Sequence, residues 1–233
     1  MFELAPGLNP DGLGQMFASH GRLQVTEFLS RDSAVELHRQ LVDSKEWRLT
    51  VNRGTEIFHF ALDDVSNWDN RKRDLLDEAV SAGGRYAFQF RYEVIRVDDN
   101  PNSVLAEFES FMSSPKIIAV MRTIAGADDI AFADAHASRY QPGHFLTAHD
   151  DHLETMGRRA AYVLNLSPKW RPDWGGLLQF LDNRGDVVRA FLPRFNVLNL
   201  FRVPQLHNVS WVTPLAAAPR YAITGWLRAN EPK

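Results

Sequence analysis

Short apolar and β-branched segments alternate with turn signals through the second half of the chain. This pattern constrains the fold more than any other feature of the sequence. Turn signals stand at Pro142-Gly143, from Pro172 to Gly176 and from Asp182 to Gly185. The strand-like segments between and beside them are 135–140, 146–151, 160–166, 177–181, 187–191, 197–201, 208–212 and 221–227. About eight short strands at this spacing are typical of a sandwich or a jelly roll.

The first half mixes helical and strand patterns. A helix begins near Ser30, where hydroxyl and acidic side chains can satisfy free amide groups. Segment 67–82 predicts a second, amphipathic helix ended by Gly83-Gly84. Segment 85–97 predicts a long strand, and two further helices follow at 104–112 and 115–124. We expect these helices to cover one sheet of the β half and bury its outer face.

Length and composition favour one domain. The chain has 233 residues, 45% of them hydrophobic and 24% charged, with no evident linker. We predict a single domain over residues 1–233, with a helix-rich supporting part at 1–130 and a β core at 131–233. The net charge of −3 gives no overall basic surface for nucleic acid, so no direct nucleic-acid partner is expected.

The chain contains no cysteine, which excludes disulfides, thiolate nucleophiles, cysteine-ligated zinc and iron–sulfur clusters. Its first residues lack the basic start and apolar stretch of a secretory signal. No apolar run approaches the roughly 20 residues that a membrane span needs. We therefore predict a cytoplasmic protein with no membrane partner.

A candidate metal site lies in the β half. His149 and Asp151 are one residue apart, His207 follows 58 positions later, and Arg220 comes 13 residues after that. Two imidazoles and one carboxylate can hold a non-haem Fe(II) on one face and leave the opposite face open. Because alternate residues of a strand share a face, His149 and Asp151 would point inward together. Arg220 would then bind the far carboxylate of a 2-oxo acid.

Each part also has a simpler interpretation. A lone His-x-Asp is common on surface loops, His207 could be a polar residue at a strand end, and Arg220 could be a solvated cation. His152 could join His149 and Asp151 in a zinc site, although on a strand it would point away from both. The remaining five histidines are assigned to the surface or the core. The specificity therefore lies in the combination of residues.

Neighbouring side chains would complete the site. Thr224 shares a strand face with Arg220 and could add a hydrogen bond from its hydroxyl. Tyr140 could direct its hydroxyl to the same place, the alternative being an ordinary core tyrosine. On segment 160–166 the inward side chains would be Ala161, Val163 and Asn165, whereas Tyr162 would face the core on the other side.

Two basic runs, Arg158-Arg159 and Lys169-Trp170-Arg171, lie close in sequence to these strands. Such runs are usually solvated, and contact with a substrate is the alternative. Gly175-Gly176 is interpreted as a tight turn, because no Lys-Ser/Thr follows it and no helix begins there.

Five strings carry a family resemblance: His149-Asp150-Asp151, Gly157 to Leu166, Trp174 to Leu178, His207 to Ser210 and Arg220 to Trp226. With them, the segment from Tyr140 to Arg228 resembles the catalytic core of 2-oxoglutarate- and Fe(II)-dependent prolyl hydroxylases. The likeness is closest to the ribosomal-protein prolyl hydroxylases and more distant to the egl-nine-type hydroxylases.

The resemblance implies a double-stranded β-helix in which His149, Asp151 and His207 bind Fe(II). It implies that Arg220 binds the C5 carboxylate of 2-oxoglutarate and that Tyr140 assists, while Thr224 is a further candidate contact. Dioxygen would be the second co-substrate, and ascorbate is an additional candidate cofactor. The implied reaction hydroxylates a prolyl residue of a protein or peptide, with a ribosomal protein or translation factor as the candidate target.

This chain departs from the family in two respects. Egl-nine-type enzymes place a 2-oxoglutarate-binding tyrosine where this chain has Val163, so that contact must come from elsewhere. The ribosomal type carries a second, non-catalytic oxygenase-like domain, which 233 residues are too few to hold.

Other functions stay open at this point. They are an oxygenase acting on a free amino acid or other small molecule, a metal-dependent hydrolase or isomerase with the same triad, and a non-catalytic β-helix binding module. The hydrolase leaves Arg220 without a purpose, and a binding module would be expected to have lost a ligand or the arginine. Nothing in the sequence indicates the oligomeric state or the carbon that is hydroxylated.

Overall fold

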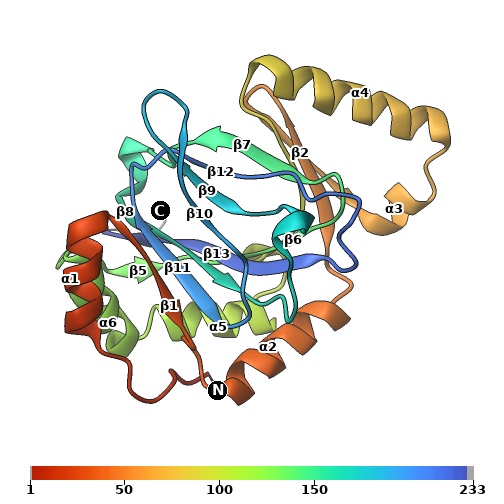
Figure 1. Cartoon of the computed structure of the whole chain (residues 1–233). Helices are drawn as coiled ribbons and strands as arrows, with labels where there is room; N and C mark the ends of the chain where they lie inside the picture. The colour runs from red at the N-terminus through yellow and green to blue at the C-terminus, as the bar shows by residue number, and fades with distance from the viewer. Residues whose placement is uncertain (1, 230–233) are drawn as a thin grey trace.

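The computed structural model describes residues 2–229, and a single antiparallel sheet system that bends back on itself lies at its centre (Figure 1). All eight strands predicted for the second half form, with bounds shifted by up to three residues. They are β6 (His136–Tyr140), β7 (Phe145–His149), β8 (Arg158–Asn165), β9 (Leu178–Leu181), β10 (Val187–Phe191), β11 (Val197–Arg202), β12 (His207–Val209) and β13 (Arg220–Arg228).

The strands make two facing layers. Neighbours in the larger layer run in the order β11, β8, β13, β6 and β4 (Phe90–Arg96), and those in the smaller layer run β7, β12, β9 and β10. Strand β4 joins the layers because it pairs with both β6 and β7. Side chains from both layers pack together in one buried cluster, whose members are Ala161, Val163, Leu178, Phe180, Phe191, Phe201 and Ala222.

Short strands extend the edges of the larger layer. Strand β1 (Arg22–Thr26) pairs with β11, and β5 (Phe132–Ala133) pairs with β13. On the β4 side, β2 (Arg48–Arg53) and β3 (Glu56–Ala61) form a hairpin that leaves β3 as an edge strand. Strands β1 and β5 and this hairpin were not predicted from the sequence, whereas β4 lies within a longer predicted strand.

Four helices cover the outer face of the larger layer (Figure 1), and three of them were predicted to do so, whereas the helix predicted at 67–82 takes no part in this cover. They are α1 (Pro10–His20), α2 (Arg31–Asp43), α5 (Val104–Met112) and α6 (Pro115–Ala125). Leu37, Phe108 and Met121 from these helices are buried in one cluster with outward side chains of the sheet such as Tyr162 and Ile223. Each large apolar side chain buried in this way contributes about 1.5–3 kcal/mol to stability. Helix α1 was not predicted.

Two further helices, α3 (Leu62–Ser66) and α4 (Asn70–Tyr86), form an extension that stands away from the two layers (Figure 1). Two predictions were wrong here. Helix α4 continues through Gly83-Gly84, and the strand predicted from residue 85 begins at Phe90. The cause is packing, since a Cβ at Gly83 would lie 2.0 Å from Oε1 of Gln89, so glycine is used for clearance within the helix.

Three single turns of 3-10 helix complete the structure: η1 (Val97–Asp99), η2 (Glu154–Met156) and η3 (Pro172–Trp174). Among residues 2–229, no helix combines the length and the hydropathy that a membrane crossing requires.

Candidate active site

His149, Asp151 and His207 come together at one end of the smaller layer. His149 is the last residue of β7 and lies opposite His207, the first residue of β12. Nε2 of His149 is 3.5 Å from Oδ1 of Asp151, and Nε2 of His207 is 3.5 Å from Oδ2 of the same carboxylate. One ligand atom from each residue lies within 4.8 Å of the others, which suits coordination of a single metal ion.

The backbone conformation that places Asp151 beside the two histidines differs from the predicted strand. Strand β7 ends at His149, and Asp151 has a φ of 62°, which is the left-handed region. Aspartate tolerates that region better than most residues because its short side chain can form local hydrogen bonds. The expectation that strand alternation aligns His149 with Asp151 was therefore wrong, and a turn after the strand brings the carboxylate to the imidazoles.

Both histidine rings are held by the same local device. Nδ1 of His149 donates to the carbonyl oxygen of Thr147 at 3.0 Å, and Nδ1 of His207 donates to that of Gln205 at 2.7 Å. A ring nitrogen that bonds to a carbonyl must carry the proton, so this bonding assigns the tautomer. Each Nε2 is thereby left with a free lone pair directed at the metal position.

Electrostatics favours the form that binds metal. Burial, together with the nearby His149, lowers the pKa of His207 to about 4. Burial alone would raise the pKa of Asp151, but interactions with His149, His207 and Trp226 lower it to about 2. At neutral pH the site therefore offers neutral His207 beside an ionised carboxylate, ready for a cation.

The structure does not form the alternative zinc site. His152 is exposed and does not belong to the group of residues 149, 151 and 207. Its backbone N–H donates to Oδ1 of Asp150 at 3.0 Å, which closes a local turn. Among residues 2–229, no other three histidine, aspartate or glutamate side chains bring their ligand atoms within 4.8 Å of one another.

Arg220 is a buried cation without an anion. Its side chain is among the largest fully buried in the protein, and burial lowers its pKa. Nη2 donates to Oδ1 of Asn165 at 3.3 Å, whereas Nε has no partner. No carboxylate of residues 2–229 lies within 4.0 Å of it to form an ion pair. Burying an unpaired charge is costly, so the guanidinium is prepared for an incoming anion.

Tyr140 and Thr224 lie on the strands around Arg220. Tyr140 pairs with Arg220 across β6 and β13, and the guanidinium carbon lies 5.1 Å from the centre of its ring. That ring stacks on Tyr92 at 5.1 Å, and burial raises the pKa of Tyr140. Thr224 is half-buried and lies opposite Val163. Contacts of Tyr140 and Thr224 with a co-substrate stay predictions.

Arg158 is a site residue whose role the sequence left undecided. Its Nη1 donates to the backbone oxygen of Asp151 at 2.9 Å, and its guanidinium lies 3.6 Å from the centre of the Trp226 ring. The adjacent Arg159 instead pairs with Asp129 at the surface. The signal available in the sequence was the position of Arg158 directly after Gly157, at the start of a strand that faces the site.

In the second basic run, only Trp170 approaches the site, since it packs against the buried cluster that contains Tyr140. Arg171 forms an exposed ion pair with Asp173, and Nε1 of Trp170 donates to the carbonyl oxygen of Gly175 at 2.8 Å. These contacts hold the loop around Gly175 and Gly176, both of which have a positive φ as a tight turn requires.

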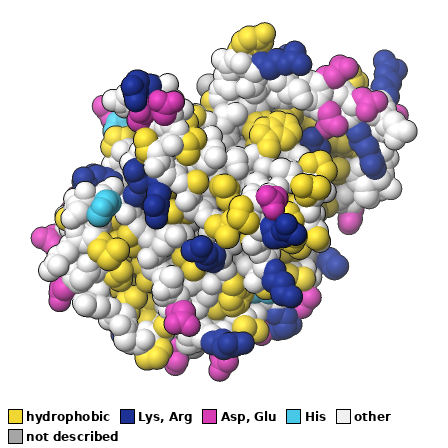
Figure 2. All heavy atoms as spheres, viewed as in Figure 1, with side chains coloured by type: hydrophobic (Ala, Val, Ile, Leu, Met, Phe, Trp, Pro, Cys, Tyr) yellow, Lys and Arg dark blue, Asp and Glu magenta, His cyan; other side chains and the backbone are white. Residues whose placement is uncertain are grey.

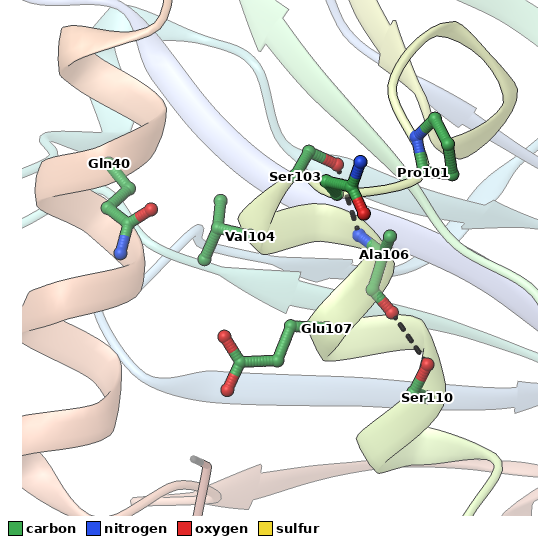
Figure 3. Close-up of a pocket in the computed structure, with 8 residues that line it drawn as sticks. Gln40, Pro101, Ser103, Val104, Ala106, Glu107 and Ser110 are labelled. Carbon is green, nitrogen blue, oxygen red and sulfur yellow. Dashed lines mark hydrogen bonds between the residues drawn. The ribbon is translucent and has the colours of Figure 1, made fainter.

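A pocket between α2 and the start of α5 lies apart from the metal-binding group (Figure 3). There the N–H of Ala106 donates to Oγ of Ser103 at 3.2 Å, and Oγ of Ser110 donates to the carbonyl oxygen of Ala106 at 2.9 Å. These bonds serve the first turns of the helix. The pocket lies among the helices that cover the outer face, whereas the metal-binding group lies on β7 and β12.

Comparison with known families indicates the class of this site. Residues 135–228 match the 2OG-Fe(II) oxygenase superfamily. Its members use Fe(II), 2-oxoglutarate and dioxygen. The cluster of His149, Asp151 and His207 fits the iron, and the unpaired Arg220 fits an anionic co-substrate.

Two curated relatives each match less than half of the chain. Prolyl 3-hydroxylase OGFOD1 of Mus musculus is 33% identical over 115 residues, which are 46% of this chain and 21% of the mouse protein. The Xenopus laevis protein of the same name is 35% identical over 100 residues, which are 40% of this chain and 19% of that protein. The matched part therefore spans about a fifth of these relatives.

Solved structures share the fold over nearly the whole chain. A Pseudomonas putida prolyl-4-hydroxylase aligns with a TM-score of 0.61 and 17% identity, covering 96% of this chain and all of that one. A Trichoplax adhaerens prolyl hydroxylase, solved with a peptide of hypoxia inducible factor, aligns with a TM-score of 0.61 and 19% identity, covering 94% and 89% of the two chains. These likenesses confirm the predicted jelly-roll fold.

Proposed function

We propose that this protein is an Fe(II)- and 2-oxoglutarate-dependent dioxygenase that hydroxylates a prolyl residue in a protein substrate. The observation that carries the proposal is the buried, unpaired Arg220 in the same β-helix as the metal-binding group. A hydrolase or isomerase would need the three metal ligands but would leave this guanidinium without a counter-ion.

Each group of site residues has its own proposed role, and three of the residues would bind the metal. His149, Asp151 and His207 would hold the iron on one face and leave the opposite face for co-substrate and dioxygen. The bound iron supplies the chemistry by which decarboxylation of 2-oxoglutarate to succinate is coupled to insertion of oxygen into a C–H bond. The protein contributes positioning and exclusion of water.

Arg220 would anchor the far carboxylate of 2-oxoglutarate through a forked, charge-assisted hydrogen bond. Asn165 holds one nitrogen of the guanidinium, and the Tyr140 ring supports the group. Apolar side chains such as Val163 and Leu178 line the space between the layers and keep water away. The carboxylate and the guanidinium would each compensate the burial of the other.

The prolyl target is supported by the relatives. The mouse protein is named as a prolyl 3-hydroxylase, and the Trichoplax adhaerens structure contains a peptide. We extend a polypeptide substrate from them to this chain, with a ribosomal protein or translation factor as the candidate. The absence of cysteine fits a reducing compartment, and we propose that the protein acts in the cytoplasm.

An anaerobic titration tests the co-substrate. Purified protein is loaded with Fe(II), and 2-oxoglutarate is added while visible absorption is recorded. We expect a charge-transfer band that saturates in the wild type. In Arg220→Ala the affinity for 2-oxoglutarate should fall by roughly 30- to 150-fold, because a charge-assisted hydrogen bond contributes about 2–3 kcal/mol.

Arg159→Ala is the matched control, because it removes a neighbouring arginine that is paired at the surface with Asp129. Its titration should follow the wild type. If folded, iron-loaded wild-type protein develops no band, it does not bind 2-oxoglutarate and the proposal is wrong. The prolyl target is tested separately by mass spectrometry of cells with and without the gene, in which one protein should lose an oxygen-sized mass increment.

A further inference from the structure

Asn199 of β11 is a polar side chain that is fully enclosed by the protein. It is 0% exposed, and within residues 2–229 its amide nitrogen Nδ2 has no hydrogen-bond partner. Charged side chains on the face of the molecule in Figure 2 lie at the surface, where water can solvate them. Asn199 is out of reach of solvent, so its free N–H group destabilises the protein unless a bound molecule accepts a hydrogen bond from it.

A neighbouring strand determines which end of this amide is free. Nε2 of Gln24, on β1, donates to Oδ1 of Asn199 at 2.9 Å. Only the oxygen of an amide can accept a hydrogen bond, so turning the Asn199 amide over would break this contact. The amide is therefore held with its oxygen toward Gln24, and the nitrogen is the end that is left for another molecule.

Asn199 belongs to the face of the larger layer that lines the space between the two layers. Leu198 and Leu200 are buried in the cluster beneath the helices, whereas Phe201 is buried in the cluster between the layers. Since alternate residues of a strand point to opposite faces, Asn199 shares the inner face with Phe201. It lies opposite Val163 of β8, an inner residue whose side chain has no polar atom to pair with it.

Along β11, Asn199 lies between the part of the strand beside the metal-binding group and the part beside Arg220. Phe201, two residues later, has its ring centre 4.6 Å from that of His207. In the opposite direction, Asn165 of β8 is the diagonal neighbour of Asn199 and accepts a hydrogen bond from Nη2 of Arg220. Diagonal neighbours on paired strands are about 7–8 Å apart, so one bound molecule can contact both.

Two buried donors on this inner face lack acceptors, namely Nε of Arg220 and Nδ2 of Asn199. The amide oxygens beside them are already used, since Oδ1 of Asn165 accepts from Arg220 and Oδ1 of Asn199 accepts from Gln24. A molecule that satisfies these two donors must therefore offer acceptors. A 2-oxo diacid does so, because both of its carboxyl groups are ionised at neutral pH and its keto oxygen carries no proton.

We propose that Asn199 is a further binding residue for the co-substrate, and that its Nδ2 donates a hydrogen bond to an oxygen of bound 2-oxoglutarate. The inference rests on the proposed function for the identity of the ligand. It gives the free amide nitrogen a purpose, since the same group that destabilises the ligand-free protein stabilises the complex.

Asn199→Leu should give a result that a purely structural role cannot give. Leucine keeps the branched shape of asparagine and has no donor, so the ligand-free variant should be at least as stable as the wild type in urea unfolding. Gln24 lines a surface groove, where water can replace the acceptor that it loses. Calorimetric titration of the Mn(II)-loaded variant should show an affinity for 2-oxoglutarate that is at least ~10-fold lower, because a charge-assisted hydrogen bond is lost.

Thr50→Val is the matched control. Thr50 of β2 is 1% exposed, its hydroxyl also lacks a partner, and β2 is separated from β13 by β4 and β6. Valine keeps the shape of threonine and removes the hydroxyl, so this variant should also be at least as stable as the wild type. Its affinity for 2-oxoglutarate should equal that of the wild type, because Thr50 lies outside the space between Arg220 and the metal-binding group.

Three results would overturn the role of Asn199. Wild-type affinity for 2-oxoglutarate in Asn199→Leu would show that no hydrogen bond is made. A clear loss of stability in the same variant would show that the amide supports the fold, and an equal loss of affinity in Thr50→Val would show an indirect effect. Wild-type protein that binds Mn(II) but not 2-oxoglutarate would instead refute the proposed function, and the inference with it.

Discussion

Each residue of the metal-binding group depends on the backbone beside it. The two histidines donate to carbonyl oxygens two residues earlier, and Asp151 relies on a left-handed backbone just after a strand. The motif His-x-Asp is therefore a strand end followed by a turn. Arg158 supports that turn by donating to the backbone oxygen of Asp151.

Asp151→Asn should separate charge from conformation. Asparagine also tolerates a φ near 62°, so the thermal unfolding temperature of the metal-free protein should change little. The affinity for Mn(II), measured by titration, should fall by at least ~100-fold because the ligand charge is lost. Asp151→Ala should lose the metal as well, and should also lower stability by about 1 kcal/mol through backbone strain. Wild-type metal affinity in Asp151→Asn would contradict the assignment.

His144 makes stability depend on pH. Burial, together with the charge of Arg91, lowers its pKa to about 3, and its Nδ1 accepts from the N–H of Gln141. The unfolded chain, with a pKa near 6.5, binds the proton more readily than the folded one. The stability contribution is complete above pH 6.5 and is lost as pH falls toward 3, by up to ~1.4 kcal/mol per pH unit.

The measurement is urea unfolding of wild type and His144→Gln at pH 7.5 and pH 5. Between pH 7.5 and pH 5, the free energy of unfolding should fall less in the variant than in the wild type. The difference should correspond to the one proton that His144 binds in the unfolded chain. The buried His136, whose pKa burial lowers to about 4, keeps part of the acid sensitivity in both proteins. Identical losses would show that the pKa of His144 is the same in the folded and unfolded states.

At the scale of elements, α4 shows how a local stop signal can be overridden. Two consecutive glycines favour the end of a helix, yet α4 continues to Tyr86. Gln89, which comes after the helix, places its side chain against Gly83, while a Cβ at Gly84 would lie 3.7 Å from the ring of Phe145. Gly83 is thus required for clearance from Gln89, whereas Gly84 has room for a Cβ.

Alanine at these two positions should have opposite effects. Gly84→Ala meets only ordinary contacts and should stabilise the protein by about 0.5–1 kcal/mol through helix propensity and a less flexible unfolded chain. Gly83→Ala would displace Oε1 of Gln89 and disturb its buried network, costing roughly 1–3 kcal/mol. Urea unfolding midpoints compare them, and equal stabilisation by both would show that Gln89 moves without cost.

At the scale of the whole molecule, the two halves of the chain have separate tasks. The second half forms the two layers and carries the metal-binding group, while helices of the first half bury the outer face of the larger layer. Strand β4, from the first half, joins the layers through β6 and β7. Ligands that bind between the layers should therefore stabilise the fold as a unit.

Thermal unfolding under nitrogen measures this linkage. Mn(II) and 2-oxoglutarate together, each at about 100 times its dissociation constant, should raise the unfolding temperature by roughly 10–20 °C, since each ligand contributes about 2.7 kcal/mol. Arg220→Ala should keep the increment from Mn(II) and lose the one from 2-oxoglutarate. An equal 2-oxoglutarate increment in both proteins would exclude Arg220 as its anchor.

Much of the fold follows from local sequence. Turn residues and short β-branched segments predicted all eight strands of the second half, because strand alternation and turn chemistry act over a few residues. The four residues His149, Asp151, His207 and Arg220 were found from residue type and order. The assignment of residues 1–233 to one domain and the cytoplasmic location stay predictions.

Only the tertiary structure decided the remainder. The turn at Asp151, the missing counter-ion of Arg220, the contact of Arg158 with the site and the continuation of α4 past Gly83 each depend on segments far apart in the chain. Local propensity carries no information on such pairs, because the energies that fix them are long-range packing, burial and hydrogen bonding. Local motifs thus indicate which residues make up the site, whereas contacts between distant segments of the folded chain determine its geometry.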